Sequence, residues 1–250
     1  MKSLIRKALA WAGYAVFNIR NRYAHDGLFT MHSDHFRRDE AFRAAYARGV
    51  EAGQGVDPGI EWRVHVALWA ASTASRAAGD FVECGVNAGV VSSAIMQSLD
   101  WRNSGRRFYL IDTFSGPVFS QYSRQEIDRG RDLAAKSALA AGAYVTDIER
   151  VRANFAEWPN ALVVRGTVPD VFATLNFGAV AFLHLDMNCA LPEKAALEFF
   201  WSRLSPGGIV LLDDYTYFGH DSQREAIDSV SARLGFKVLA LPSGQGLIVK

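Results

Sequence analysis

A loop with an acid and two glycines is the first segment that could bind a small molecule. It reads Glu-Cys-Gly-Val-Asn-Ala-Gly, from Glu83 to Gly89, and its glycines allow the backbone to approach a ligand closely. The loop is not the dinucleotide motif G-x-G-x-x-G, because Glu83 takes the place of the first glycine. A carboxylate there repels a pyrophosphate and suits an ammonium group. The loop therefore favours S-adenosylmethionine, and a ligand-free turn between a strand and a helix is the alternative.

Asp112 is the second candidate for cofactor binding. It ends the next apolar run, where an acid normally binds the ribose hydroxyls of a nucleotide cofactor. A nicotinamide-dependent oxidoreductase is the runner-up among enzymes, but the missing G-x-G-x-x-G counts against it. We expect the cofactor to contact Glu83, Gly85, Asn87, Gly89, Asp112, Thr113 and Gly166.

Asp186, Asp213 and Asp214 form a second group of candidates, at the ends of two predicted strands. If these strands are neighbours, their terminal acids converge, and crowded carboxylates repel one another unless a cation neutralises them. Oxygen ligands suit a hard divalent ion, so we expect Mg²⁺ at these three acids, to which Asn188 could add a carbonyl oxygen. The alternative is that Asp186 and Asp213 cap loops while Asp214 pairs with an arginine.

Two side chains are candidates for the general base of a group-transfer reaction. Asp186 lies among the acids just described, and His220 lies on a loop that follows the fifth predicted strand. The ordinary pKa of histidine is close to neutral pH, which suits proton transfer, although a plain surface histidine is the alternative. His184, two residues before Asp186, is expected to be a hydrogen-bonded core histidine.

Aromatic and basic residues could line the remaining walls of the site. Trp62, Arg63 and His65 lie near the start of the helix before the first predicted strand, from which they could reach the cofactor. Some tyrosines could form walls of the acceptor pocket, and ordinary half-buried packing is the alternative. They are Tyr46, Tyr122, Tyr215 and Tyr217.

Five short apolar runs separated by helical segments predict a mostly parallel α/β sheet within residues 79–250. The predicted strands are Phe81–Cys84, Phe108–Ile111, Ala161–Val164, Val180–Leu185 and Ile209–Leu212. The predicted helices are Val90–Leu99, Ser123–Ala141 and Leu191–Leu204. Ser205–Gly208 predicts a turn before the fifth strand, and the runs around Pro242–Gly246 predict a C-terminal antiparallel hairpin. Ligands of such sheets bind beyond the carboxyl ends of the strands, where the candidate residues lie.

Residues 1–78 are expected to form an N-terminal helical extension, with helices at Ala41–Val50 and Trp62–Ala78. The chain begins with a basic amphipathic segment, in which apolar residues recur on one helical face. These residues are Leu4, Ala8, Trp11, Ala15 and Ile19. We expect this segment to pack on the domain or on a partner subunit, which gives a homo-oligomer. Weak contact with a membrane surface is the alternative.

The composition of the chain excludes several classes of protein. Hydrophobic residues make up 50% of it, which supplies a large core and excludes global disorder. A net charge of +1 argues against a nucleic-acid-binding protein. Two cysteines cannot make a disulfide framework, and low cysteine content is typical of the reducing cytoplasm, where we expect the protein.

Four segments of the chain resemble the macrocin O-methyltransferase family. They are Asp80–Val86, Leu110–Gly116, Leu183–Asp186 and Leu204–Tyr215, the last with its Ser-Pro-Gly-Gly and Asp-Asp-Tyr motifs. The family comprises class I S-adenosylmethionine-dependent enzymes that methylate sugar hydroxyls in antibiotic biosynthesis, with relatives in polysaccharide gene clusters. The resemblance implies a Rossmann-like class I methyltransferase sheet and a sugar or glycosylated metabolite as acceptor. The site residues it implies are Glu83, Gly85 and Asp112 for the cofactor and Asp186, Asp213 and Asp214 for Mg²⁺.

One stretch departs from the family pattern. The family commonly has Asp-x-Asp-Leu-Tyr-Glu after the fourth strand, whereas this chain has Asp-Met-Asn-Cys-Ala-Leu from Asp186 to Leu191. Asn188 replaces the second acid, and the Tyr-Glu pair is missing. This stretch is the best support for a rival interpretation, in which the protein is a methyltransferase-like binding protein without catalysis.

Overall fold

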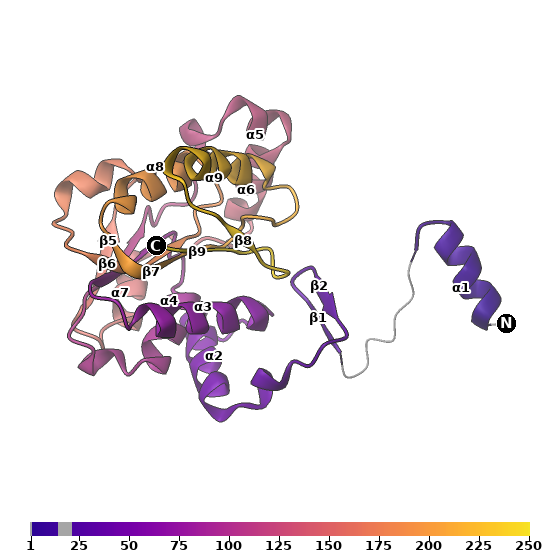
Figure 1. The fold of residues 1–250 in the computed structure, drawn as a ribbon, viewed down its shortest axis with the longest axis horizontal. Coiled ribbons are helices and arrows are strands. Elements are labelled where there is room, and N and C mark those ends of the chain that lie inside the picture. Colours follow the sequence, from indigo (N-terminus) through magenta and orange to yellow (C-terminus); the bar gives the residue numbers. More distant parts are fainter. Residues whose placement is uncertain (1, 15–21) are drawn as a thin grey trace.

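The computed structural model describes residues 2–14 and 22–250, and its centre is a seven-stranded sheet (Figure 1). The strand order is β5-β4-β3-β6-β7-β9-β8. The strands are β3 (Asp80–Cys84), β4 (Phe108–Asp112), β5 (Ala161–Arg165), β6 (Val180–Leu185), β7 (Leu204–Leu212), β8 (Leu239–Ala240) and β9 (Gly246–Val249). Strands β3 to β7 are parallel, whereas β9 runs antiparallel to both β7 and β8. The predicted parallel sheet with its C-terminal antiparallel hairpin is confirmed.

The order of the strands decides where a ligand can bind. The chain passes from β3 outward through β4 to β5, and then returns to the other side of β3 with β6 and β7. Such a reversal opens a crevice between the loops that leave neighbouring strands in opposite directions. The crevice lies at the carboxyl ends of β3, β4 and β6, which carry the loops with the candidate residues.

The Ser205–Gly208 segment is part of β7, so the prediction of a turn there is wrong. Leu204 pairs with Val180, and Ile209 pairs with Phe182. The four residues Ser205–Gly208 therefore lie opposite a single residue of β6 and form a bulge. Gly207 has φ of 79°, which glycine adopts readily. Its N–H donates to the carbonyl of Lys250 at 3.0 Å, so pairing with the C-terminus continues the strand through the bulge.

Helices cover both faces of the sheet because alternate strand residues point to opposite sides. On β3, Phe81 packs in a core with Ala67, whereas Val82 packs in a second core with Leu197. Figure 1 shows α8 and α9 above the sheet and α2, α3 and α4 below it. The helices are α2 (Glu40–Ala52), α3 (Glu61–Ala74), α4 (Val90–Ser98), α7 (Ile148–Asn154), α8 (Ala190–Trp201) and α9 (Asp221–Leu234).

Several helix boundaries differ from the prediction. The expected helix at Ser123–Ala141 is divided into α5 (Arg124–Asp128) and α6 (Arg131–Ala140), because Gly130 between them has φ of 73°. The helix expected to reach Leu204 ends at Trp201, because Leu204 already pairs in the sheet. Helices α7 and α9 had no counterpart in the prediction.

The N-terminal part is not wholly helical. It contains an antiparallel hairpin of β1 (Tyr23–His25) and β2 (Leu28–Thr30), which the sequence did not predict. Helix α1 (Lys2–Trp11) is present, and Trp11 at its end is 92% exposed; Ala15 and Ile19 lie outside the described residues. No helix in the part of the chain that the structure describes is long and apolar enough to cross a membrane. The boundary at residue 78, the homo-oligomer and the membrane-surface contact stay predictions.

Candidate active site

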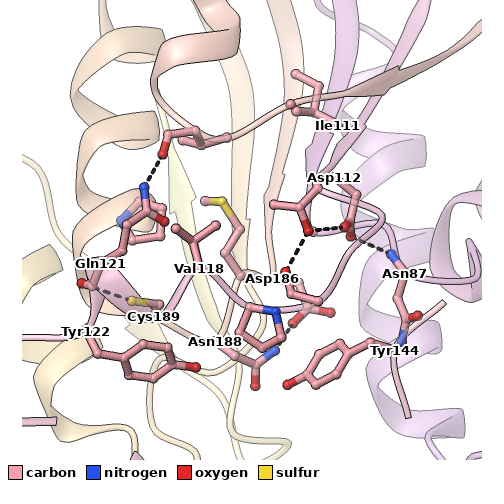
Figure 2. Close-up of a pocket in the computed structure, with 18 residues that line it drawn as sticks. Asn87, Ile111, Asp112, Val118, Gln121, Tyr122, Tyr144, Asp186, Asn188 and Cys189 are labelled. Carbon is pink, nitrogen blue, oxygen red and sulfur yellow. Dashed lines mark hydrogen bonds between the residues drawn. The ribbon is translucent and has the colours of Figure 1, made fainter. Parts of the chain in front are cut away.

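A pocket opens at the carboxyl ends of β3, β4 and β6 (Figure 2). Five of the seven predicted cofactor residues and one predicted base line it: Gly85, Asn87, Asp112, Thr113, Gly166 and Asp186. The segments before α5 and α7 add further walls, among them Gln121, Tyr122 and Tyr144. Glu83 and Gly89 are not among the residues that line the pocket.

Packing against protein, and not only the approach of a ligand, requires glycine at Gly85 and Gly89. A Cβ on Gly85 would lie 1.8 Å from the backbone oxygen of Asp186, and its φ is 94°. A Cβ on Gly89 would lie 2.5 Å from the ring of Phe155. The loop after β3 is therefore packed against the loop after β6, and Gly85 and Asp186 line the same pocket.

Asp112 holds the first loop in place and still has room for a ligand. Its carboxylate accepts the N–H of Asn87 at 2.8 Å and the N–H of Phe114 at 2.9 Å. The Thr113 hydroxyl, which also donates to Gly116, lies 3.4 Å from Oδ1 of the same carboxylate. A carboxylate offers about four lone-pair sites, so about one or two remain for hydroxyl donors. The side chain of Asn87 in turn accepts the N–H of Val145 at 2.8 Å, which fixes the loop to the segment before α7. The arrangement fits a ribose at Asp112.

Glu83 lies inside the sheet beside His184. The two side chains meet at 2.9 Å, from His184 Nδ1 to Glu83 Oε1, and both are buried. Burial by itself lowers the pKa of His184, but its contacts with Asp213 and Glu83 outweigh burial and raise the pKa to about 10. The expected core histidine is thus a buried cation between two acids. Oε2 of Glu83 is buried without a hydrogen-bond partner in the described structure, and Glu83 does not line the pocket.

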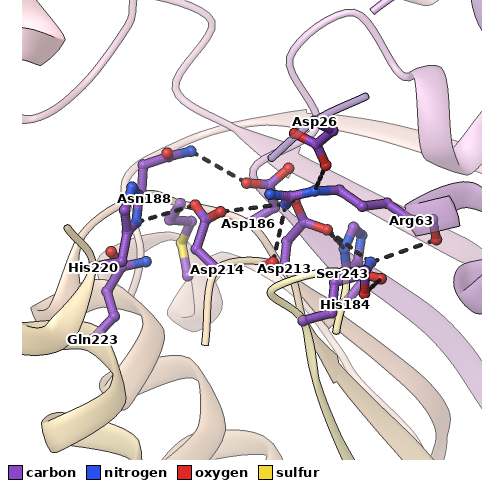
Figure 3. A network of polar contacts seen from close by, with 12 residues as sticks. Asp26, Arg63, His184, Asp186, Asn188, Asp213, Asp214, His220, Gln223 and Ser243 are labelled. Carbon is purple, nitrogen blue, oxygen red and sulfur yellow. Dashed lines mark hydrogen bonds and ion pairs between the residues drawn. The ribbon is translucent and has the colours of Figure 1, made fainter. Parts of the chain in front are cut away.

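Arg63 is the centre of a buried network around the acid pair (Figure 3). Its Nη1 forms a short ion pair with Asp213 Oδ2 and lies 3.3 Å from Asp214 Oδ1. Its Nε lies 2.6 Å from Asp26 in the β1–β2 turn. The guanidinium also lies 4.6 Å from the ring centre of Tyr217. Residues from both ends of the chain therefore meet at this one side chain.

The ionised form of Asp186 is disfavoured in this environment. Burial and the neighbouring Asp213 and Asp214 raise the pKa of Asp186 well above its usual range. Asn188, which replaces the second acid of the family motif, donates to Asp186 Oδ1 at 3.2 Å. Asn188 is therefore a hydrogen-bond donor to Asp186, and both residues line the same pocket.

His220 is buried, in contrast to the alternative of a surface histidine. Its Nδ1 lies 3.2 Å from Asp214 Oδ2, and its ring lies edge-on to Tyr217. Burial and the positive charge of Arg131 lower the pKa of His220 to about 4. The imidazole is therefore neutral at pH 7. Its Nδ1 also lies 3.4 Å from Arg131 Nη2, and His220 is not among the residues that line the pocket. Figure 3 places His220 and Asn188 on the same side of the acid cluster.

The three acids as they lie do not fit the predicted Mg²⁺ ion. Their oxygens already face donors, chiefly the guanidinium of Arg63. Within residues 2–14 and 22–250, no group of three or more His, Cys, Asp or Glu side chains is arranged to hold a metal ion. The prediction of a metal ion rested on the mutual repulsion of the acids, and the buried Arg63 relieves that repulsion. The contact of Arg63 with Asp214 agrees with the alternative, in which Asp214 pairs with an arginine.

The basic and aromatic candidates take different positions from those expected. Arg63 binds the acids, whereas Trp62 and His65 pack against Phe36 in an aromatic cluster. Among the tyrosines expected at the acceptor pocket, Tyr122 lines the pocket at the carboxyl ends of β3, β4 and β6. The hydroxyl of Tyr46 instead donates a hydrogen bond to Asp57, and the hydroxyl of Tyr215 donates one to Asp228. Sequence reasoning missed Asp26, Tyr144 and Gln245, which lie in loops and carry no periodic or motif signal.

Comparison with known proteins gives a consistent picture. A family model described as macrocin-O-methyltransferase (TylF) matches residues 66–235. A curated relative from Streptomyces olivaceus, 8-demethyl-8-(2,3-dimethoxy-alpha-L-rhamnosyl)-tetracenomycin-C 4'-O-methyltransferase, is 30% identical over 164 residues. The aligned part covers 63% of this chain and 59% of that relative, so the chain spans less than two thirds of the relative's length.

Solved structures show the same fold at low sequence identity. The O-methyltransferase NovP is 18% identical with a TM-score of 0.63, and the match covers 75% of this chain and 79% of NovP. The calicheamicin methyltransferase CalS11 is 17% identical with a TM-score of 0.56, and the match covers 94% of this chain and 98% of CalS11. The expected class I methyltransferase fold is confirmed by these likenesses.

Proposed function

The chain belongs to the macrocin O-methyltransferase family, and from that membership we propose that it transfers a methyl group from S-adenosylmethionine to a hydroxyl of a sugar or glycosylated metabolite. The observation that carries the proposal is the pocket between β3, β4 and β6, which has a ribose-type acid at one wall and a buried acid–histidine network beside it. The curated relative named above acts on a rhamnosyl group, which supports a sugar as the acceptor.

The cofactor is proposed to lie along the carboxyl ends of β3 and β4. Asp112 would accept the ribose hydroxyls, whereas Glu83, buried beside His184 and not among the residues that line the pocket, is given no contact with the cofactor in this proposal. Gly85, Asn87, Thr113 and Gly166 would shape the remaining contacts, while Gly89 supports the loop from behind. When bound, S-adenosylmethionine supplies an electrophilic methyl group for in-line attack by the acceptor oxygen. The pocket contributes by holding both reactants in that alignment.

His220 is the proposed general base. It is neutral because its pKa is low, and its Nδ1 lies 3.2 Å from Asp214 Oδ2 and 3.4 Å from Arg131 Nη2. The proposal requires the tautomer that donates Nδ1–H to Asp214, in which Nε2 takes a proton from the acceptor hydroxyl. Asp214 would then stabilise the imidazolium that forms. Asp186 is the less suitable base because its Oδ1 already accepts the amide of Asn188, and no step in this proposal passes through a metal ion.

A methyl-transfer assay tests the function. Purified protein is incubated with methyl-labelled S-adenosylmethionine and a panel of glycosides, nucleotide sugars and simple phenols, and products are identified by mass spectrometry. Labelled sugar products are expected, while binding of S-adenosylmethionine without any turnover would favour the binding-protein interpretation. Calorimetry with NAD is the control for the oxidoreductase alternative and is expected to show no binding.

His220→Ala tests the proposed base. The variant is expected to lower kcat by about 10²–10⁴-fold, since general base catalysis contributes that much, while its S-adenosylmethionine affinity stays unchanged. His32→Ala, in an exposed loop of the N-terminal part, is the matched control and should keep full activity. A His220 variant with undiminished kcat would remove His220 from the mechanism.

A further inference from the structure

The guanidinium of Arg63 occupies the position among the acids that a metal ion would need. It is 6% exposed and contacts carboxylates of Asp213 and Asp214, as well as the backbone oxygen of Asp213 at 3.0 Å. Arginine keeps its positive charge at any accessible pH, so this cation is permanent. Figure 3 shows the side chain reaching across the cluster between Asp26 and Asp213.

The remaining oxygens of the cluster are also in use. Asp213 Oδ1 accepts Gln245 Nε2 at 2.9 Å and lies 3.7 Å from His184 Nε2. Asp214 Oδ2 faces His220, and Asp186 Oδ1 accepts Asn188. Five of the six carboxylate oxygens of the three acids therefore already face a nitrogen donor or cation. Mg²⁺ demands near-ideal octahedral oxygen ligation, which these engaged oxygens do not offer.

A further acid, Asp26, connects the network to the N-terminal part. Asp26 occupies the β1–β2 turn with φ of 51°, and its Oδ2 meets Arg63 Nε at 2.6 Å. Arg63 thus contacts acids on two sides: its Nε meets Asp26, and its Nη1 meets Asp213 and Asp214. Both Asp26 and Arg63 precede residues 66–235, the part matched by the family model.

We propose that Arg63 serves as a built-in cation in place of a divalent metal ion, and that it positions Asp213 and Asp214 for a reaction that needs no added metal. Arg63 is a positioning residue, because it acts through the acids and, by way of Asp214, on His220. One consequence of this proposal is that methyl transfer continues in the presence of a chelator, and only this consequence rests on the proposed function. Its main consequence, the failure of the acid cluster to bind a metal, does not depend on turnover.

Titration with Mn²⁺, followed by its electron paramagnetic resonance signal, tests the proposal on the full-length protein. Wild type and Arg63→Lys, which keeps the charge, are expected to show no saturable binding at the acids. Arg63→Gln removes the guanidinium that contacts both Asp213 and Asp214 and should raise Mn²⁺ affinity by about tenfold or more, because these two carboxylates then repel one another and only His184, beside Asp213, is left as a counter-charge. The gain should disappear in the double variant Arg63→Gln with Asp213→Asn. Arg107→Gln, which removes an arginine from a more exposed ion pair with Asp80, is the matched control and should change nothing.

Two results would overturn the proposal. Saturable Mn²⁺ binding by the wild type that Asp213→Asn removes would show a metal site at the acids, whether or not the Arg63 variants fold. A folded Arg63→Gln variant that gains no affinity would show that Arg63 does not stand in for a metal. Methyl transfer by the wild type in excess EDTA is the expected second result, and transfer that requires added Mg²⁺ would contradict it. Absence of methyl transfer under every condition would instead count against the proposed function, since the Mn²⁺ titration is read without turnover.

Discussion

Replacing Asp112 with alanine tests the placement of the cofactor most directly. The carboxylate stands at the end of β4, lines the pocket and accepts two backbone N–H groups, from Asn87 and Phe114. If it also accepts ribose hydroxyls, Asp112→Ala removes at least one charge-assisted hydrogen bond of about 1.5–3 kcal/mol. Since about 1.4 kcal/mol corresponds to a factor of ten, the Kd for S-adenosylmethionine should rise about 10- to 150-fold.

The variant will also loosen the loop after β3, because the N–H of Asn87 loses its partner. Asp80→Ala is the control for this effect, since Asp80 also accepts a backbone N–H, from Arg107 at 2.9 Å, but lies at the opposite end of β3. Isothermal titration calorimetry should show a weakened Asp112 variant and an Asp80 variant with wild-type affinity. Equal affinities for Asp112→Ala and wild type would refute the ribose assignment, and equal weakening of both variants would show that the effect is structural.

Three further predictions concern stability and assembly. Gly85→Ala should lower Tm strongly, because its Cβ would lie 1.8 Å from the backbone oxygen of Asp186. The control Gly105→Ala, with φ of 67° and no neighbour within 4 Å, should cost only about 1–2 kcal/mol of backbone strain. Similar Tm values for the two variants would contradict the packing argument. Burial and Asp214 raise the pKa of Glu193 from 4.5 to about 8, so the folded state holds a proton that the unfolded state releases, and stability falls as pH rises between these values. Glu193→Gln cannot ionise, so its advantage over wild type in urea unfolding should grow between pH 5 and 8, by up to about 1.4 kcal/mol per pH unit, and a constant difference would refute this. Light scattering should show an oligomer that is lost when residues 1–21 are removed, and a monomer in both proteins would reject the predicted role of that segment.

Local patterns in the sequence determined the sheet and one wall of the site. Strands such as Val180–Leu185 are apolar runs bounded by turn residues, and Glu83, Asp112 and Asp186 stand at or just beyond the ends of such runs. Burial on both faces of a parallel strand leaves this signature in the order of residues, so the strands and the loops that follow them could be predicted. The Ser-Pro-Gly-Gly segment misled the prediction because a bulge inside a strand uses the same residues as a turn.

Only the tertiary structure decided how the acids are neutralised. Asp213 and its partner Arg63 are 150 residues apart, and Asp26 approaches from a hairpin without a sequence signal. The sequence pattern of three converging carboxylates is the same whether a metal ion or an arginine balances their charge. Any nearby cation relieves their repulsion, so the pattern does not identify the cation. Which cation that is depends on the packing of α3 and the β1–β2 turn against the sheet. The low pKa of His220 arises in the same way, from burial and from Arg131 on a distant helix, and these are properties of the folded environment.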